Sequence, residues 1–154
     1  MRPTAMLAGR ATDMAVLHAQ AFDEPWSAKA FEELMASPGV FALAVEDRRL
    51  VGLILMRAVA GEAEVLTLAV APGRRRQGVA HGLLDAGLAT AIAAGAERAF
   101  LEVAEDNGPA IALYRASGFT DAGRRPGYYA RRGSAPVDAL VLAVTLPALN
   151  SKGP

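Results

Sequence analysis

A carboxylate and a phenol in the second half of the chain have the residue types needed for acid–base chemistry. Glu102 interrupts the otherwise apolar run Ala99–Ala104, and a carboxylate is costly to bury unless it is paired or used. Asn107, Ile111 and Tyr114 stand at positions i, i+4 and i+7 of a helical segment and therefore share one face. Two plainer alternatives remain: Glu102 could face water at a sheet edge, and Tyr114 could be a core aromatic with a satisfied hydroxyl.

A basic turn lies within Val70–Leu84, where a strand-like run passes through arginines and glycine into a helical run. The free amides of a helix's first turn bind phosphate oxygens, and Gly78 allows those oxygens to approach the backbone. Arg74, Arg75 and Arg76 add charge-assisted donors. The spacing excludes a P-loop and a dinucleotide fingerprint. The turn predicts a local anion site, and a solvated basic turn is the alternative.

The elements expected to position these residues follow from hydrophobic periodicity and turn residues. Helices are predicted for Thr12–Gln20, capped by Thr12 or Asp13, and for Ser27–Met35, Gly78–Ala94 and Asn107–Ser117. Strands are predicted for Val40–Val45, Leu50–Val59, Glu64–Val70, Ala99–Ala104 and Val137–Leu146, with another extended segment starting at Gly118-Phe119. Strands before the long helix and strand–helix–strand alternation after it favour an α/β (α+β) fold around a mixed sheet.

Composition and net charge limit the number of domains, the partners, the location and the metal sites that can be expected. The 154 residues, 53% hydrophobic and 21% charged, predict a single domain over 1–154 with a flexible tail from about residue 147. The 16 basic and 16 acidic residues cancel, which argues against nucleic-acid and membrane partners. The absence of cysteine excludes disulfides and a thiol nucleophile, and the missing signal and spanning segments favour a cytoplasmic location. His18 and His81 lack metal-ligand spacing, so we expect no metal and give both a surface or capping role.

The two chemical segments resemble a known superfamily. Arg75-x-x-Gly78-x-Ala80 resembles the acyl-CoA signature of the GNAT acetyltransferases, and Leu101–Phe119 is similar to their Leu-Glu-Val and Asn-x-x-Ala-Ile-x-Leu-Tyr-x-x-x-Gly-Phe segment. Pro25-Trp26-Ser27 and Arg125–Tyr129 extend the resemblance to the ribosomal-protein-alanine acetyltransferase (RimI-type) branch. It implies a GNAT-like mixed, mostly antiparallel sheet with helices on both faces, and acetyl-CoA as co-substrate.

The resemblance also implies residue roles. Glu102 matches the general base of RimI-type enzymes, and the phenol of Tyr114 is suited to protonate a leaving thiolate. Trp26, Tyr128 and Tyr129 flank the acceptor region, with plain packing as their alternative. Coenzyme binding is expected from Leu68, Ala69, Val70, Arg75, Arg76, Gln77, Gly78, Val79, Ala80, Asn107 and Tyr114.

These residues predict an acetyl-CoA-dependent N-acetyltransferase that works by direct attack of a primary amine. The expected acceptor is the N-terminal α-amine of a protein or peptide, for example a ribosomal protein. A small-molecule amine or an internal lysine as acceptor, and a non-catalytic CoA-binding module, are the alternatives.

Overall fold

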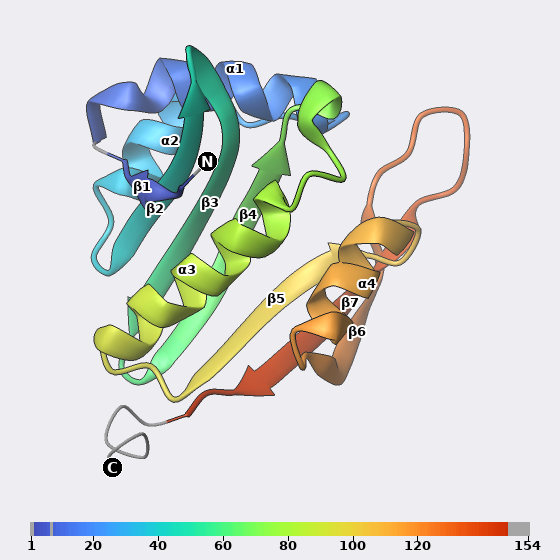
Figure 1. Ribbon diagram of the computed structural model, residues 1–154. Coiled ribbons are helices and arrows are strands. Elements are labelled where there is room, and N and C mark those ends of the chain that lie inside the picture. The colour runs from blue at the N-terminus through green and yellow to red at the C-terminus, as the bar shows by residue number, and fades with distance from the viewer. Residues whose placement is uncertain (1, 7, 148–154) are drawn as a thin grey trace.

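The computed structural model describes residues 2–6 and 8–147, and Figure 1 shows a twisted sheet with helices on both faces. The helices are α1 (Ala11–Ala21), α2 (Ala28–Met35), α3 (Val79–Ala93) and α4 (Gly108–Ala116). The strands are β1 (Thr4–Ala5), β2 (Val40–Asp47), β3 (Arg49–Val59), β4 (Glu62–Val70), β5 (Arg98–Ala104), β6 (Thr120–Tyr129) and β7 (Val137–Thr145). Short 3-10 turns cover Ala8–Arg10 and Pro72–Arg74.

The sheet has the strand order β1-β2-β3-β4-β5-β7-β6 among the described residues. Adjacent strands are antiparallel except β4 and β5, which are parallel. The connection from β4 to β5 runs through α3, as a parallel pair requires. The predicted mixed, mostly antiparallel sheet is confirmed.

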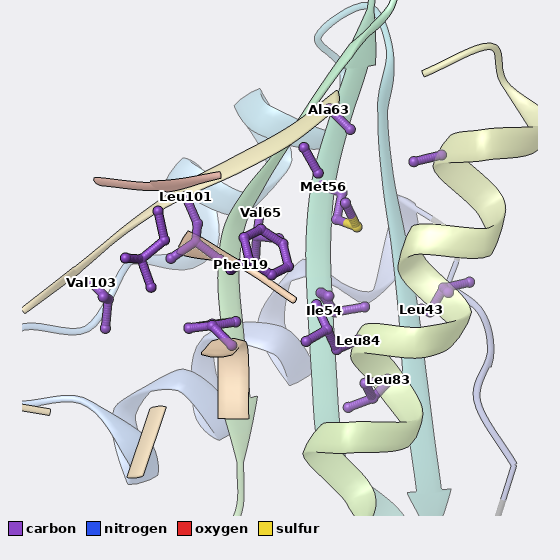
Figure 2. Packing of buried hydrophobic residues seen from close by; sticks show 14 of the residues in the cluster. Leu43, Ile54, Met56, Ala63, Val65, Leu83, Leu84, Leu101, Val103 and Phe119 are labelled. Carbon is purple, nitrogen blue, oxygen red and sulfur yellow. The ribbon is translucent and has the colours of Figure 1, made fainter. Parts of the chain in front are cut away.

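Successive residues of β3 belong alternately to two hydrophobic cores, one on each face of the sheet. Leu53 and Leu55 lie in the cluster that contains residues of α1 and α2, whereas Ile54 and Met56 lie in the cluster that contains residues of α3. All four side chains are completely buried. Figure 2 shows Ile54 and Met56 beside helix α3. Because successive strand residues point to opposite faces, β3 is buried from both sides and anchors the helices of both layers.

Helix α3 packs closely on the sheet at Gly87. A Cβ atom built at this position would lie 2.7 Å from Met56 Sδ and 3.1 Å from Ile54 Cδ1. Glycine therefore allows the close approach that fixes α3, and with it the preceding turn, against β3.

Strands β4 and β5 pair over part of their length and then separate. Their pairing runs from Glu62 opposite Arg98 to Val65 opposite Leu101. Against β3, the register of β4 shifts at the next residue, so Leu66 is an extra residue in a β-bulge. A bulge bends its strand, and Figure 1 shows β4 and β5 diverging toward their arrowheads.

The structure differs from the prediction at the start of α1 and in strand β1, which was not predicted. Thr12 and Asp13 do not cap α1, because the turn Ala8–Arg10 leads directly into it and Asp13 pairs with Arg10 at 2.7 Å. Strand β1 has two residues and β6 is exposed almost throughout, so neither carries a clear alternating pattern. The predicted flexible tail lies, apart from Pro147, outside the described residues.

Candidate active site

A cleft of about 530 Å³ opens where β4 and β5 separate. Its walls come from five segments. They are the end of α1 with the following loop as far as Trp26, the stretch Val65–Leu68 of β4, the stretch Leu101–Ala104 of β5, the start of α4, and Tyr128–Arg131. Glu102 and Tyr114, which lie on different elements, both line this cleft.

Glu102 is held at the cleft by an ion pair. Nη1 of Arg125 lies 2.7 Å and 3.0 Å from the two carboxylate oxygens, and the Glu102 side chain is 23% exposed. Strand β5 lies between β4 and β7, so the sheet-edge alternative is wrong. Leu101 and Val103 point into the core beneath α3, so Glu102 points to the opposite face of the sheet.

Tyr114 belongs both to the core and to the cleft. Its ring packs edge-on against Phe119 with 5.8 Å between ring centroids, and the residue is 6% exposed. Burial raises the pKa of the Tyr114 phenol well above its usual range. The hydroxyl therefore keeps its proton at neutral pH, as a proton donor must.

Asn107 caps α4. Its Oδ1 accepts a hydrogen bond from the amide of Ala110 at 3.2 Å, and Pro109 occupies the first turn. Asn107 and its neighbour Asp106 both line the cleft, and Asp106 accepts two hydrogen bonds from Arg131, at 2.7 Å and 2.9 Å. This pair ties the loop after β6 to the start of α4.

The basic turn presents free amides at the start of α3. The first hydrogen bond of this helix joins the Gly82 amide to the Gly78 carbonyl at 3.0 Å, so the amides of Val79 and Ala80 have no partner within the helix. Gly78 is left-handed, with φ +79°, and a Cβ there would meet nothing within 4 Å. These amides and the open space before Gly78 fit a phosphate group.

The arginines of the turn have different surroundings. Arg74 donates to Asp47 at 2.9 Å and to the Gln77 side chain at 3.3 Å, which fixes the turn to the hairpin between β2 and β3. Arg75 and Arg76 are both exposed, and Arg76 has a left-handed φ of 63°. Neither Arg75 nor Arg76 lines the cleft; they follow β4 beyond it.

The backbone of β4 past the bulge has one free edge. The Ala71 amide donates to the Val51 carbonyl of β3 at 2.8 Å. Amides alternate in direction along a strand, so the amide of Ala69 also faces β3, and those of Leu68 and Val70 face the opening toward β5. Leu68 and Val70 thus have amides placed to bind a ligand oxygen, whereas Ala69 is a buried core residue.

The three aromatic residues expected at the acceptor side all line the cleft. Trp26 also packs on Phe31, with 5.5 Å between ring centroids. Tyr128 is 51% exposed, and the centroid of its ring lies 4.3 Å from the guanidinium carbon of Arg125. Burial, followed by the nearby charge of Glu102, raises the pKa of the Tyr129 phenol. Packing and cleft lining are therefore not exclusive alternatives for these side chains.

His18 corrects a prediction. It is 2% exposed and lines the cleft, so the surface or capping role is wrong for this residue. A helical position facing the sheet buries it, and Thr67 of β4 supplies a polar partner at 3.0 Å. The sequence signal was Thr67, a hydroxyl within an apolar strand. His81 is exposed and pairs with Asp85 at 3.3 Å, as expected for a surface residue.

Within residues 2–6 and 8–147, no group of three or more His, Cys, Asp and Glu side chains is placed to hold a metal ion. No helix in the same part of the chain is both long and apolar enough to cross a bilayer.

Comparison with known proteins identifies the family. The profile of the Acetyltransferase (GNAT) family matches residues 11–119. The [ribosomal protein bS18]-alanine N-acetyltransferase of Escherichia coli K12 is 30% identical over 122 residues, which cover 79% of this chain and 82% of that one. The crystal structure of the ribosomal-protein-S18-alanine N-acetyltransferase from Escherichia coli superposes with a TM-score of 0.86 at 24% identity, covering 96% of both chains.

A mycothiol acetyltransferase of Clavibacter michiganensis is 39% identical over 100 residues; the match covers 64% of this chain and 30% of that longer protein. The family match and the relatives, on a mixed sheet whose parallel strands separate, show that the chain is of the class of acetyl-CoA-dependent acyltransferases. Within that class, the chain belongs to the GNAT acetyltransferase family.

Proposed function

We propose that this chain transfers the acetyl group of acetyl-CoA to the N-terminal α-amine of a protein or peptide, with Glu102 as general base and Tyr114 as general acid. The observation that carries the proposal is that both side chains line one cleft at the point where β4 and β5 separate. The cleft lies at the free edge of β4, and the basic turn follows β4 beyond the cleft, which leaves room for the extended acyl-CoA molecule to reach from one to the other.

The coenzyme portion fits the turn and the free edge. Amides of Val79 and Ala80, with the space in front of Gly78, would bind the pyrophosphate, and the Arg75 and Arg76 guanidinium groups would add positive charge. Gln77 shapes the turn through its bond with Arg74.

The reacting end fits the cleft. Acetyl-CoA supplies an acetyl group activated as a thioester. The amides of Leu68 and Val70 face the opening and would stabilise negative charge on the thioester oxygen. Ala69 holds this stretch against β3, and Asn107 lines the cleft at the start of α4.

The chemistry requires one proton to leave the amine and one to reach sulfur. The ammonium form of the acceptor has no lone pair, and an α-amine with a pKa of about 7.7–8.0 needs much less help than a lysine with a pKa of about 10.4. Glu102 accepts the amine's proton as nitrogen bonds to the carbonyl carbon. Tyr114 protonates the sulfur as the carbon–sulfur bond breaks. The products are an amide and a thiol; Glu102 then releases its proton to solvent, and Tyr114 takes one up from solvent.

The relatives and the lining of the cleft support a peptide acceptor. The Escherichia coli relative acts on the alanine of ribosomal protein bS18, which supports a peptide N-terminus, for example that of a ribosomal protein, as acceptor here. Trp26, Tyr128 and Tyr129 line the cleft and would contact the first residues of such a peptide. A cytoplasmic site of action, without nucleic-acid or membrane partners, remains part of the proposal.

A second candidate is a small-molecule amine. It is favoured by the 39% identity to the mycothiol acetyltransferase over 100 residues. Glu102 and Tyr114 could serve either acceptor. The presence of both groups in one cleft argues against a non-catalytic CoA-binding module.

A thiol-release assay with acetyl-CoA separates the candidates. Peptides that differ in their first residue are compared with amino sugars and polyamines at equal concentration. The proposal predicts turnover on peptides that depends on the first residue. Preference for a non-peptide amine would reject the peptide acceptor.

A further inference from the structure

His18 and Thr67 form a buried polar pair in the wall of the cleft, and the acid–base chemistry described above does not use it. His18 lies on α1 and Thr67 on β4, directly after the bulged residue Leu66. The two are 2% and 7% exposed, and both line the cleft.

The hydrogen bonds of His18 fix its tautomer. The backbone amide of Trp26 donates to Nδ1 at 3.0 Å, so Nδ1 carries no proton. In the neutral ring the proton is therefore on Nε2, which lies 3.0 Å from Thr67 Oγ1 and donates to it. Burial lowers the pKa of His18 to about 4, so the ring is neutral under ordinary conditions.

Aromatic packing holds the ring in this orientation. Phe22 and Trp26 stack on His18 with centroid distances of 4.3 Å and 4.9 Å, and Phe31 meets it edge-on at 5.4 Å. The ring cannot turn without displacing these neighbours. The direction of its Nε2–H bond toward Thr67 is therefore set by the fold.

The Thr67 hydroxyl is left with a proton to donate. Its oxygen already accepts from His18, and a hydroxyl has one donor of its own. Thr67 lies on the face of the sheet that carries α1, and Glu102 points to the same face from β5. Thr67 and Glu102 therefore border the opening between β4 and β5 from its two sides.

We propose that Thr67 donates a hydrogen bond to the carbonyl oxygen of the acceptor's first residue, and that His18 is the positioning residue that directs the hydroxyl. The inference rests on the proposed function, because an α-amine with a carbonyl beside it is the end of a peptide. Glu102 receives the amine's proton while Thr67 binds the neighbouring oxygen. The pair selects α-aminoacyl acceptors over plain alkylamines, which lack this oxygen.

Two acceptors test the contact. One is a short peptide that begins with alanine, and the other carries a trans-alkene in place of the first peptide bond, which removes the carbonyl oxygen without adding charge. For the unmodified protein we expect kcat/KM to be about tenfold higher for the peptide, the worth of one hydrogen bond. Thr67→Val, which keeps the shape and removes the hydroxyl, should abolish this preference by raising the peptide's KM.

Matched measurements make the result specific. Thr67→Ser retains a hydroxyl and should restore the preference, and the KM for acetyl-CoA should stay unchanged in both variants. Nitrogen NMR of the unmodified protein should show His18 protonated at Nε2 and bare at Nδ1. This spectrum tests the role of His18 without a substitution that could unfold the chain.

Three results would overturn the inference. One is a Thr67→Val variant that keeps the preference for the peptide, and another is an equal loss of activity on both acceptors. The third is a His18 ring protonated at Nδ1. If the unmodified protein acetylates no peptide at all, the proposed function fails and the inference fails with it. If the protein acetylates peptides and Thr67→Val has the same preference as the unmodified protein, only the inference fails.

Discussion

Arg125 on β6 reaches over the intervening strand β7 to pair with Glu102 on β5. Nη1 of Arg125 lies 2.7 Å and 3.0 Å from the two carboxylate oxygens. On β7, Ala139 is in register with both Arg125 of β6 and Ala104 of β5. Its side chain is small, so the guanidinium can pass over β7. The ion pair therefore fixes the proposed base by a contact between two strands that are not neighbours.

Replacing either partner should affect turnover unequally. Glu102→Gln removes the proton acceptor and should lower kcat by about 10²-fold or more. Arg125→Gln keeps the carboxylate but releases it, so we expect a smaller loss of about tenfold in kcat/KM. Steady-state kinetics measures both. Arg98→Gln is the control, since Arg98 lies at the far end of β5 in an exposed pair with Glu62. An Arg125→Gln variant as active as Arg98→Gln would contradict the positioning role.

Tyr114→Phe should lower kcat at least about tenfold, because the leaving sulfur loses its proton donor. The ring still packs on Phe119, so folding and acetyl-CoA binding, checked by thermal unfolding and calorimetry, should remain. Since burial raises the Tyr114 pKa above its ordinary value of 10.0, the phenol stays protonated as pH rises. Below pH 10, the rate of the unmodified protein should therefore show no decrease caused by ionisation of Tyr114. Any decrease in that range of the pH–rate profile should also be present in Tyr114→Phe. Unchanged turnover of this variant would reject the assignment.

Gly78→Ala should weaken coenzyme binding. Its φ of +79° costs alanine about 1–2 kcal/mol, and the added methyl group projects into the space proposed for phosphate. Isothermal titration should show a raised Kd for acetyl-CoA. Gly73→Ala, in the same turn but without a left-handed φ, has equal open space and serves as the control. Equal affinity in the two variants would argue against the phosphate site.

Stability should fall in acid through His18. Its pKa is lowered from 6.5 to about 4 in the folded chain. As pH falls, the unfolded chain therefore binds a proton at His18 before the folded chain does. The free energy of unfolding should therefore decrease as pH drops from about 6.5 toward about 4, and rise with pH over the same window. Urea unfolding at several pH values measures this slope.

The control for this slope is a pair of glutamine variants. His18→Gln should show a flatter slope than the unmodified protein, whereas exposed His81→Gln should not. If His18→Gln leaves the slope intact, the buried neutral ring is not its source.

Local pattern predicted the elements that carry strong periodicity. Helix α3 and strands β2 to β5 were expected within a few residues, because burial from one or both faces imposes a pattern on the sequence. Strand β6 has no such pattern, since nearly all of its residues are exposed. Its position is set instead by pairing with β7 and by ion pairs such as Arg124–Asp138 at 2.7 Å.

The sequence predicted those residues of the candidate site that have a reactive or aromatic side chain and also belong to a family motif. Glu102, Tyr114 and Asn107 all line the cleft, as do the three expected aromatic residues. Arg125, Thr67 and the buried position of His18 were missed, because each depends on a contact between segments far apart in the chain. Sequence spacing gives no sign of a guanidinium crossing β7. Thr67 stands out as a hydroxyl in an apolar strand, but the sequence does not show that it faces His18, 49 residues away.

The decisive experiment for acetyl transfer to an α-amine monitors thiol release from acetyl-CoA in the presence of a peptide and maps the acetylated atom by mass spectrometry. We expect one thiol per acetylated peptide, with the acetyl group on the α-amine and the rate reduced in Glu102→Gln and Tyr114→Phe. Binding of acetyl-CoA without transfer, or an acetyl group found on a lysine side chain instead, would contradict it.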